Sequence, residues 1–172
     1  MLPLIGKSIC SEFFKAGAKV CIIDKKDIPY FVGDLADEDT LRAFADKVIT
    51  ENGRVDCLIN NGMLSMGGLN NCNYQDFNYV LRVGISAPFM LTKLFMEHFG
   101  AGASIVNISS SRDRMSQPDT ESYSAAKGGI AALTHAMAVS LAGKVRVNSI
   151  SPGWIDTDFK VYSGPDALQH PA

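Results

Sequence analysis

Residues 41–60 read LRAFADKVITENGRVDCLIN, and this stretch decides the fold class. Its first half repeats apolar residues at the spacing of one helix face: Leu41, Phe44, Ala45 and Val48. Gly53 is typical of a helix end, and residues 55–59 then form a short apolar run. An amphipathic helix followed at once by an apolar strand is the repeating unit of an α/β fold with a parallel sheet.

The same alternation of helix and strand extends over the rest of the 172 residues. We expect helices over residues 6–16, 37–52, 74–99 and 123–142, and strands over residues 19–23, 30–32, 55–59, 104–108 and 145–150. Apolar strands separated by helices predict a doubly wound parallel sheet with helices on both faces. We therefore expect a single three-layer α/β/α domain over residues 1–172, since this length is typical of one domain.

Composition excludes several classes of partner. The net charge is −2 and no block of like charge occurs, so neither nucleic acid nor an anionic membrane is expected as a partner. The sequence contains no run of eighteen apolar residues, so we expect no membrane span. The apolar start of the chain is too short for a secretory signal. The four cysteines form no C-x-x-C pair or metal-ligand cluster, so we expect reduced thiols, no metal and a cytoplasmic location.

Five candidate residues follow expected strands, close to the point where each strand ends. Ligands of open α/β sheets bind beyond the carboxyl ends of the strands. The candidates at these ends are Asp24, Asp34, Asn60, Ser110 and Pro152. The sequence therefore predicts a ligand site along this edge of the sheet.

Tyr123 and Lys127 carry the sharpest chemical pattern. Their spacing places both side chains on one face of a helix, one turn apart. A nearby ammonium favours the charged form of a phenol, and lowering a phenol pKa from about 10 to about 7 takes about 4 kcal/mol. A tyrosine with such a pKa can exchange a proton near neutral pH, and Ser110 can hydrogen-bond a substrate oxygen. A surface tyrosine and lysine that merely share a helix are the alternative.

Five segments together resemble the short-chain dehydrogenase/reductase family. They are GDLAD at 33–37, INNG at 59–62, SIVNISS at 104–110, YSAAKGG at 123–129 and VNSISPGWIDT at 147–157. They occur in the family's order from about residue 5 to residue 172. The resemblance implies a Rossmann-like fold and a nicotinamide-dependent oxidoreductase.

The resemblance also implies a role for each matching residue. Tyr123 would be the general acid/base, Lys127 would lower its pKa and hold the nicotinamide ribose, and Ser110 would orient the substrate oxygen. The cofactor-binding residues implied, besides Tyr123 and Lys127, are Gly6, Asp24, Asp34, Leu35, Asn60, Gly62, Pro152, Gly153, Ile155 and Thr157. Asp24 would accept the adenine ribose hydroxyls and repel a 2′-phosphate, which favours NAD. Lys25 and Lys26 leave NADP as the alternative.

Several parts of the family pattern are missing. Of its glycine-rich phosphate turn only Gly6 has a counterpart, and the strand before that turn is absent. Five residues separate Asp24 from Tyr30, whereas a parallel crossover needs a dozen or more. The domain is expected to be truncated at the C-terminus, and the sheet to be open beside residues 19–23. Gly84 stands where the family has an asparagine, and Gly84→Asn is expected to be tolerated.

The function that these residues predict is hydride transfer between NAD(H) and a small alcohol or ketone substrate. The alternative is a catalytically silent relative that acts as a binding or assembly subunit. The two long helices at 74–99 and 123–142 hold more apolar residues than one buried face requires. Since the family pairs these helices, the resemblance implies a homodimer or homotetramer.

Overall fold

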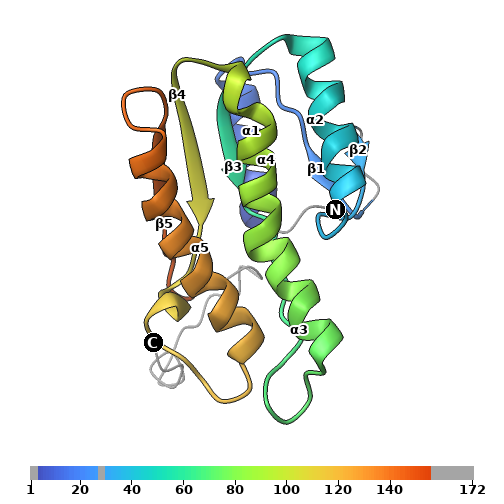
Figure 1. Ribbon diagram of the computed structural model, residues 1–172, viewed down its shortest axis with the longest axis vertical. Coiled ribbons are helices and arrows are strands. Elements are labelled where there is room, and N and C mark those ends of the chain that lie inside the picture. The colour runs from blue at the N-terminus through green and yellow to red at the C-terminus, as the bar shows by residue number, and fades with distance from the viewer. Residues whose placement is uncertain (1–3, 27–29, 156–172) are drawn as a thin grey trace, which may run out of the picture.

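A computed structural model of the protein describes residues 4–26 and 30–155 (Figure 1). The helices and strands alternate as the sequence predicts. In chain order they are α1 (Leu4–Lys15), β1 (Ile23–Asp24), β2 (Phe31–Val32), α2 (Glu38–Asn52), β3 (Val55–Asn60), α3 (Tyr74–Leu81), a π-helical segment η1 (Arg82–Ser86), α4 (Ala87–Phe95), the 3-10 turn η2 (Met96–His98), β4 (Phe99–Ile108), the 3-10 turn η3 (Ser111–Asp113), α5 (Glu121–Ser140) and β5 (Arg146–Ile150).

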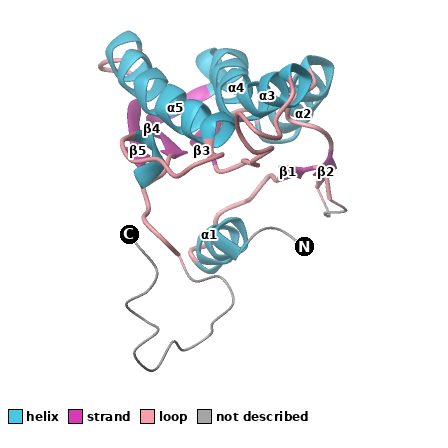
Figure 2. Ribbon diagram, turned by 90° about the horizontal axis from the view of Figure 1, so that it is seen from below, coloured by secondary structure: helices cyan, strands magenta, loops and turns pink. Residues whose placement is uncertain are grey.

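All strand pairs in the described part of the chain are parallel, and helices lie on both sides of them. Strands β3, β4 and β5 form one sheet in that order, and β1 pairs with β2 in a second sheet. Figure 2 shows α1 on one side of the strands and α2, α3, α4 and α5 on the other. This is the three-layer Rossmann-like arrangement that the sequence predicts.

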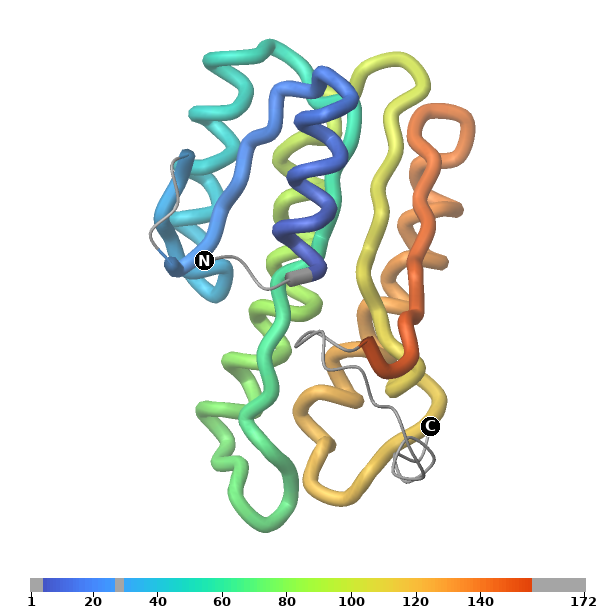
Figure 3. The backbone as a smooth tube through the Cα atoms, turned by 180° about the vertical axis from the view of Figure 1, so that it is seen from behind, coloured from blue at the N-terminus to red at the C-terminus, as the bar shows by residue number. Residues whose placement is uncertain are grey.

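The sheet is divided between β1 and β3, as expected from the missing strand. The predicted strand over residues 19–23 is reduced to Ile23–Asp24, which pairs only with Phe31–Val32. A cavity of about 890 Å³ is lined by residues of both sheets, by α1 residues such as Ile9 and Phe13 and by α4 residues such as Leu91. Figure 3 shows α1 in front of β3, beside the segment that runs into β1.

Helix α2 begins and ends where its local sequence predicts. The Asp37 carboxylate accepts a hydrogen bond from the backbone N–H of Asp39 at 3.1 Å and so caps the first turn. Gly53 has φ 74° and donates its N–H to the Ile49 carbonyl. Local hydrogen bonds therefore set both ends of the helix that precedes β3.

The expected helix over residues 74–99 is interrupted by η1 before Pro88. Proline has no N–H for a helical hydrogen bond, and Ala87 donates its N–H five residues back, to the Arg82 carbonyl. This wider turn lets the helical run continue into α4. Pro88 is thus accommodated near the start of α4 rather than ending the helix.

The whole run Tyr74–His98 has the length and mean hydropathy that a membrane-spanning helix would need, although charged residues interrupt it. In the structure 44% of its most apolar window is buried inside the protein. Val80, Leu91 and Phe95 are among the core residues that it supplies. Packing in the core therefore accounts for part of its apolar character.

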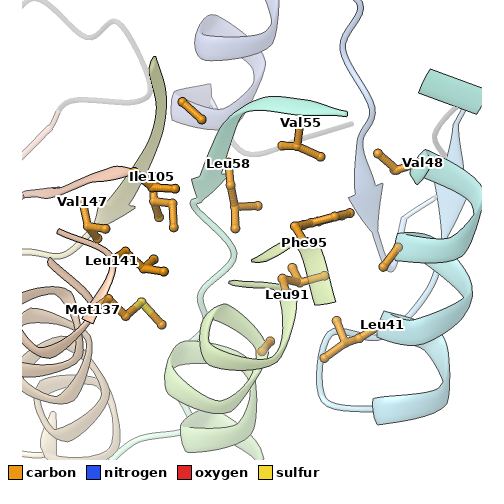
Figure 4. Packing of buried hydrophobic residues seen from close by; sticks show 14 of the residues in the cluster. Leu41, Val48, Val55, Leu58, Leu91, Phe95, Ile105, Met137, Leu141 and Val147 are labelled. Atoms are coloured by element: carbon orange, nitrogen blue, oxygen red, sulfur yellow. The ribbon is translucent and has the colours of Figure 1, made fainter. Parts of the chain in front are cut away.

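The core lies between the sheets and the helices α2, α4 and α5 (Figure 4). Phe44 of α2 stands at its centre, with the rings of Phe31, Tyr30 and Phe95 at 5.6, 6.2 and 6.4 Å in edge-to-face geometry. These contacts join α2 to β2 and α4, and they fix the small sheet against the rest of the domain.

Candidate active site

Tyr123 and Lys127 lie on one face of α5, next to the end of β4. The Lys127 ammonium lies 5.5 Å from the centre of the Tyr123 ring. Lys127 also donates a hydrogen bond from Nζ to the Ile108 carbonyl at 2.6 Å. The i, i+4 spacing predicted the shared face, while the bond to Ile108 ties the pair to the carboxyl end of the central strand.

The serines after β4 complete this arrangement. Ser109 Oγ donates to the backbone carbonyl of Lys127 at 2.9 Å. Ser110 is buried, and its Oγ accepts a hydrogen bond from the N–H of Arg112 at 3.2 Å. The Ser110 hydroxyl hydrogen can therefore be directed toward a substrate oxygen. The structure thus brings all three predicted catalytic residues to the junction of β4 and α5.

Burial changes the charge behaviour of Lys127. Its side chain is 4% exposed, and loss of solvent lowers its pKa from 10.5 to about 8. At neutral pH the ammonium is still charged. A positive charge is therefore held beside the Tyr123 ring in a poorly solvated place.

A second cluster lies at the ends of β1 and β2, where the adenine end of a cofactor is predicted. The Asp34 carboxylate accepts hydrogen bonds from the Ala36 N–H at 2.9 Å and from the Tyr79 hydroxyl at 3.1 Å, and it pairs with the Lys25 ammonium at 3.0 Å. Burial would raise the pKa of Asp34, but these hydrogen bonds and the lysine charge outweigh it and hold the pKa below its ordinary value. Asp24 accepts from the Lys26 N–H at 2.8 Å.

Two predicted glycines allow close approach of neighbouring segments. A Cβ on Gly6 would lie 2.9 Å from the Asn61 side-chain nitrogen, and a Cβ on Gly62 would collide with Leu35. Six predicted cofactor residues line the large cavity: Gly6, Asp24, Asp34, Leu35, Asn60 and Gly62. The structure therefore collects the predicted adenosine-side residues around one space.

Asn60 is held by a buried chain of hydrogen bonds. Its Nδ2 donates to Asn107 Oδ1 at 2.7 Å, and Asn107 Nδ2 donates to Thr134 Oγ1 at 2.8 Å. Asn107 is fully buried, and Thr134 in turn donates to the Ile130 carbonyl at 2.7 Å. This chain joins β3, β4 and α5 just below the site. The sequence analysis did not single out Asn107. The signal that could have indicated it is a polar residue inside the apolar strand at 104–108.

The segment after β5 lies beside η3. The Pro152 carbonyl accepts the N–H of Ser111 at 2.9 Å, so the loop is held next to Ser110. Gly153 and Ile155 are exposed, and Thr157 lies outside the described residues. The nicotinamide-side residues Ser110, Tyr123, Lys127, Pro152, Gly153 and Ile155 are not on the lining of the large cavity. The predicted site therefore falls into two regions, one on the cavity and one at the β4–α5 junction.

The sequence prediction for Gly84 was wrong. Gly84 is buried in η1, and a Cβ there would lie 2.9 Å from the Ala126 Cβ and 3.1 Å from the Met63 sulfur. This glycine is needed for the close contact between η1 and α5. Gly84→Asn should therefore strain the packing below Tyr123 rather than be tolerated.

Sequence reasoning also missed Tyr79. Its hydroxyl accepts from Lys25 Nζ at 2.8 Å and donates to Asp34. Tyr79 lies 45 positions from Asp34, on a helix to which the sequence analysis assigned no contact with the adenine end of the site. No local pattern indicated this contact. Among the described residues, no group of three or more His, Cys, Asp or Glu side chains is arranged to hold a metal ion.

The sequence of the chain is similar to those of known proteins. The short chain dehydrogenase family model matches residues 4–167. An uncharacterized oxidoreductase of Thermotoga maritima is 36% identical, over 89% of this chain and 68% of that protein. The chain spans 63% and 53% of two further curated relatives.

Solved structures agree in fold. An apo SCOR enzyme from Clostridium thermocellum has a TM-score of 0.83 and is 41% identical, over 89% of this chain and 69% of that one. A 4-hydroxyisoleucine dehydrogenase complexed with NADH has a TM-score of 0.83 and is 26% identical, over 90% and 72% of the two chains.

Proposed function

Because the chain belongs to the short-chain dehydrogenase family, we propose that it is an oxidoreductase that transfers a hydride between NAD(H) and an alcohol or carbonyl substrate. The observation that carries the proposal is the Lys127 ammonium, held 5.5 Å from the Tyr123 ring by a bond to Ile108. A phenol beside a buried cation is the arrangement that proton exchange with a substrate oxygen requires.

The reaction needs one proton from the protein for each hydride. In reduction, Tyr123 Oη donates a proton to the substrate oxygen, and in oxidation it takes the proton back. Lys127 stabilises the phenolate, and Ser110 Oγ donates a hydrogen bond to the same substrate oxygen. A bound nicotinamide supplies or accepts the hydride. Each protein group thus acts on charge at the substrate oxygen rather than on the hydride itself.

The residues present fit the adenosine end and the nicotinamide ribose of a dinucleotide. Asp24 lies on the cavity with Gly6 and Gly62, which pack closely against Asn61 and Leu35. Lys127 would hold the nicotinamide ribose. The first turn of α1 around Gly6 would offer backbone N–H groups to a pyrophosphate.

NAD is the proposed cofactor. The Asp24 carboxylate would accept hydrogen bonds from the ribose hydroxyls and would repel a 2′-phosphate. The nearby Lys25 is engaged with Tyr79 and Asp34, at 2.8 and 3.0 Å. A relative of the same fold, 4-hydroxyisoleucine dehydrogenase, was solved as a complex with NADH, which supports this choice.

The proposal is tested with the purified chain and NADH, and with Tyr123→Phe beside it. Fluorescence titration measures NADH binding, and turnover is followed at the NADH absorbance with a panel of small alcohols and ketones. Tyr123→Phe should lower turnover by about 10²-fold or more and leave NADH binding unchanged, since only the proton-transferring hydroxyl is removed.

Tyr74→Phe is the matched control, because Tyr74 is 79% exposed and lies on α3, outside the site. It should keep full turnover. NADH binding without turnover on any substrate, or equal turnover in Tyr123→Phe, would contradict the catalytic assignment. Absence of both binding and turnover would favour a silent binding or assembly role.

We further infer a cytoplasmic homo-oligomer that forms through α4 and α5. All four cysteines are free thiols, which suits a reducing compartment. Phe89 on α4 and Val139 on α5 are 52% and 68% exposed, whereas Val80 and Ile130 on the same two helical runs are buried within the chain. Light scattering after gel filtration should give a dimer or tetramer, and Val139→Glu should shift it toward monomer.

A further inference from the structure

The loop after β3 closes onto the first turn of α5, far from it in sequence. Asn70 donates to the Asp119 carboxylate three times, from its backbone N–H at 3.1 Å and from Nδ2 at 2.9 and 2.8 Å. The Leu69 N–H donates to Glu121 Oε2 at 3.3 Å. We call the contact of Gly67 and Asn70 with Asp119 and Ser122 the clasp.

Ser122 forms the buried part of the clasp. It is fully buried, and its Oγ donates to the Gly67 carbonyl at 2.7 Å and accepts the Met66 N–H at 3.4 Å. The Ser122 N–H also points to the Gly67 carbonyl, at 3.3 Å. Thr120, the N-cap of α5, makes no side-chain capping bond. The loop therefore satisfies an N–H of the first turn that a helix normally leaves to its own cap.

The two segments meet backbone to backbone. A Cβ on Gly68 would collide with the Glu121 side chain and would lie 2.6 Å from the Asp119 Cα. Asp119 has φ 57°, and among the described residues it alone has a positive φ without being glycine. Side-chain-bearing residues adopt this conformation rarely and hold it where the surroundings impose it. The three bonds from Asn70 are such a constraint.

We propose that Asn70, Asp119 and Ser122 are positioning residues that set the distance between the Tyr123 hydroxyl and Lys127. Tyr123 follows Ser122 directly and lies in the turn that the clasp holds. Lys127, one turn later, is anchored separately by Ile108 and Ser109 at the end of β4. Loosening the clasp therefore moves the phenol while the lysine stays in place.

This inference rests on the proposed role of Tyr123 in proton transfer, and its consequence is chemical rather than only structural. A Tyr123 hydroxyl that moves away from Lys127 and Ser110 no longer meets a substrate oxygen in the geometry that proton transfer needs. Catalysis is sensitive to such movement, since a displacement of about 1 Å at a reacting group can cost about 10²-fold in rate.

The test uses the full chain labelled with 3-fluorotyrosine and observed by fluorine NMR. The Tyr123 signal is the one that Tyr123→Phe removes. In Ser122→Ala and Asn70→Ala, the chemical shift of this signal should change, while the Tyr30 signal stays unchanged. Turnover should fall at least tenfold, with the KM for NADH unchanged.

Asn73→Ala is the matched control. Asn73 ends the same loop and caps α3, where its Oδ1 accepts the Asp76 N–H at 2.8 Å. Its loss should lower the melting temperature as Asn70→Ala does, without moving the Tyr123 signal. If Ser122→Ala does not fold, Asn70→Ala carries the test, because Asn70 is exposed.

An unmoved Tyr123 signal in a folded clasp variant would overturn the proposal, and so would an equal movement in Asn73→Ala. The fluorine spectrum needs neither cofactor nor substrate. A wild-type chain without turnover would therefore refute the proposed function while leaving the positioning of Tyr123 decided by the NMR result.

Discussion

Replacing Lys127 by methionine should stabilise the protein at neutral pH while removing its activity. The lysine is 4% exposed, and burial lowers its pKa from 10.5 to about 8. A change of this size corresponds to about 3 kcal/mol of unfavourable free energy for the buried charge at pH 7. Methionine has a similar length and no charge, but it leaves the Ile108 carbonyl without its partner, which costs about 1–2 kcal/mol. The expected net gain in the free energy of unfolding is about 1–2 kcal/mol.

The sign of the pH dependence follows from the two pKa values. The unfolded chain keeps the Lys127 proton up to pH 10.5, whereas the folded protein releases it near pH 8. Between these values the unfolded state binds more protons than the folded state. The contribution of Lys127 to the free energy of unfolding of the wild-type protein therefore rises with pH. From pH 7 to pH 10 the rise is about 2.5 kcal/mol. The methionine variant lacks this rise. Its higher free energy of unfolding at pH 7 should therefore approach that of the wild type as the pH increases and then fall below it.

Urea unfolding of wild type and Lys127→Met at pH 7, 8.5 and 10 measures the effect. Titrations elsewhere in the protein cancel in the difference between the two. Lys93→Met, an exposed position on α4, is the control and should stay within about 0.5 kcal/mol of wild type at each pH. A Lys127→Met variant that is less stable than wild type at pH 7, with a difference that does not change up to pH 10, would refute the reasoning.

Three further predictions follow from packing and charge. Gly84→Asn should lower the free energy of unfolding by about 1–3 kcal/mol, because its Cβ meets Ala126 at 2.9 Å; an unchanged thermal melt would contradict the contact. Phe44→Ala should cost about 3–5 kcal/mol in urea unfolding, since it removes the ring shared by α2, β2 and α4; a loss below about 1 kcal/mol would show that the two sheets pack independently. Asp24→Ala should weaken NADH binding and relax discrimination against NADPH in fluorescence titrations, and an unchanged preference would rule out its role.

Local sequence patterns were sufficient to predict the elements whose hydrogen bonds join residues a few positions apart. The apolar spacing from Leu41 to Val48, the Asp37 cap and the Gly53 stop determined α2, because each contact joins residues at most four positions apart. The shared face of Tyr123 and Lys127 follows from helix geometry for the same reason. The missing glycine-rich turn and strand likewise predicted that the sheet would open beside residues 19–23.

Only the tertiary structure decided what depends on distant segments. The pKa of Lys127 comes from burial under several elements, and the need for Gly84 comes from Ala126 on another helix. The Asn70–Asp119 contact joins residues 49 positions apart. An isolated segment carries no record of which remote surface will cover it, so periodicity and capping can indicate the helix that bears Tyr123 but not the loop that holds it in place.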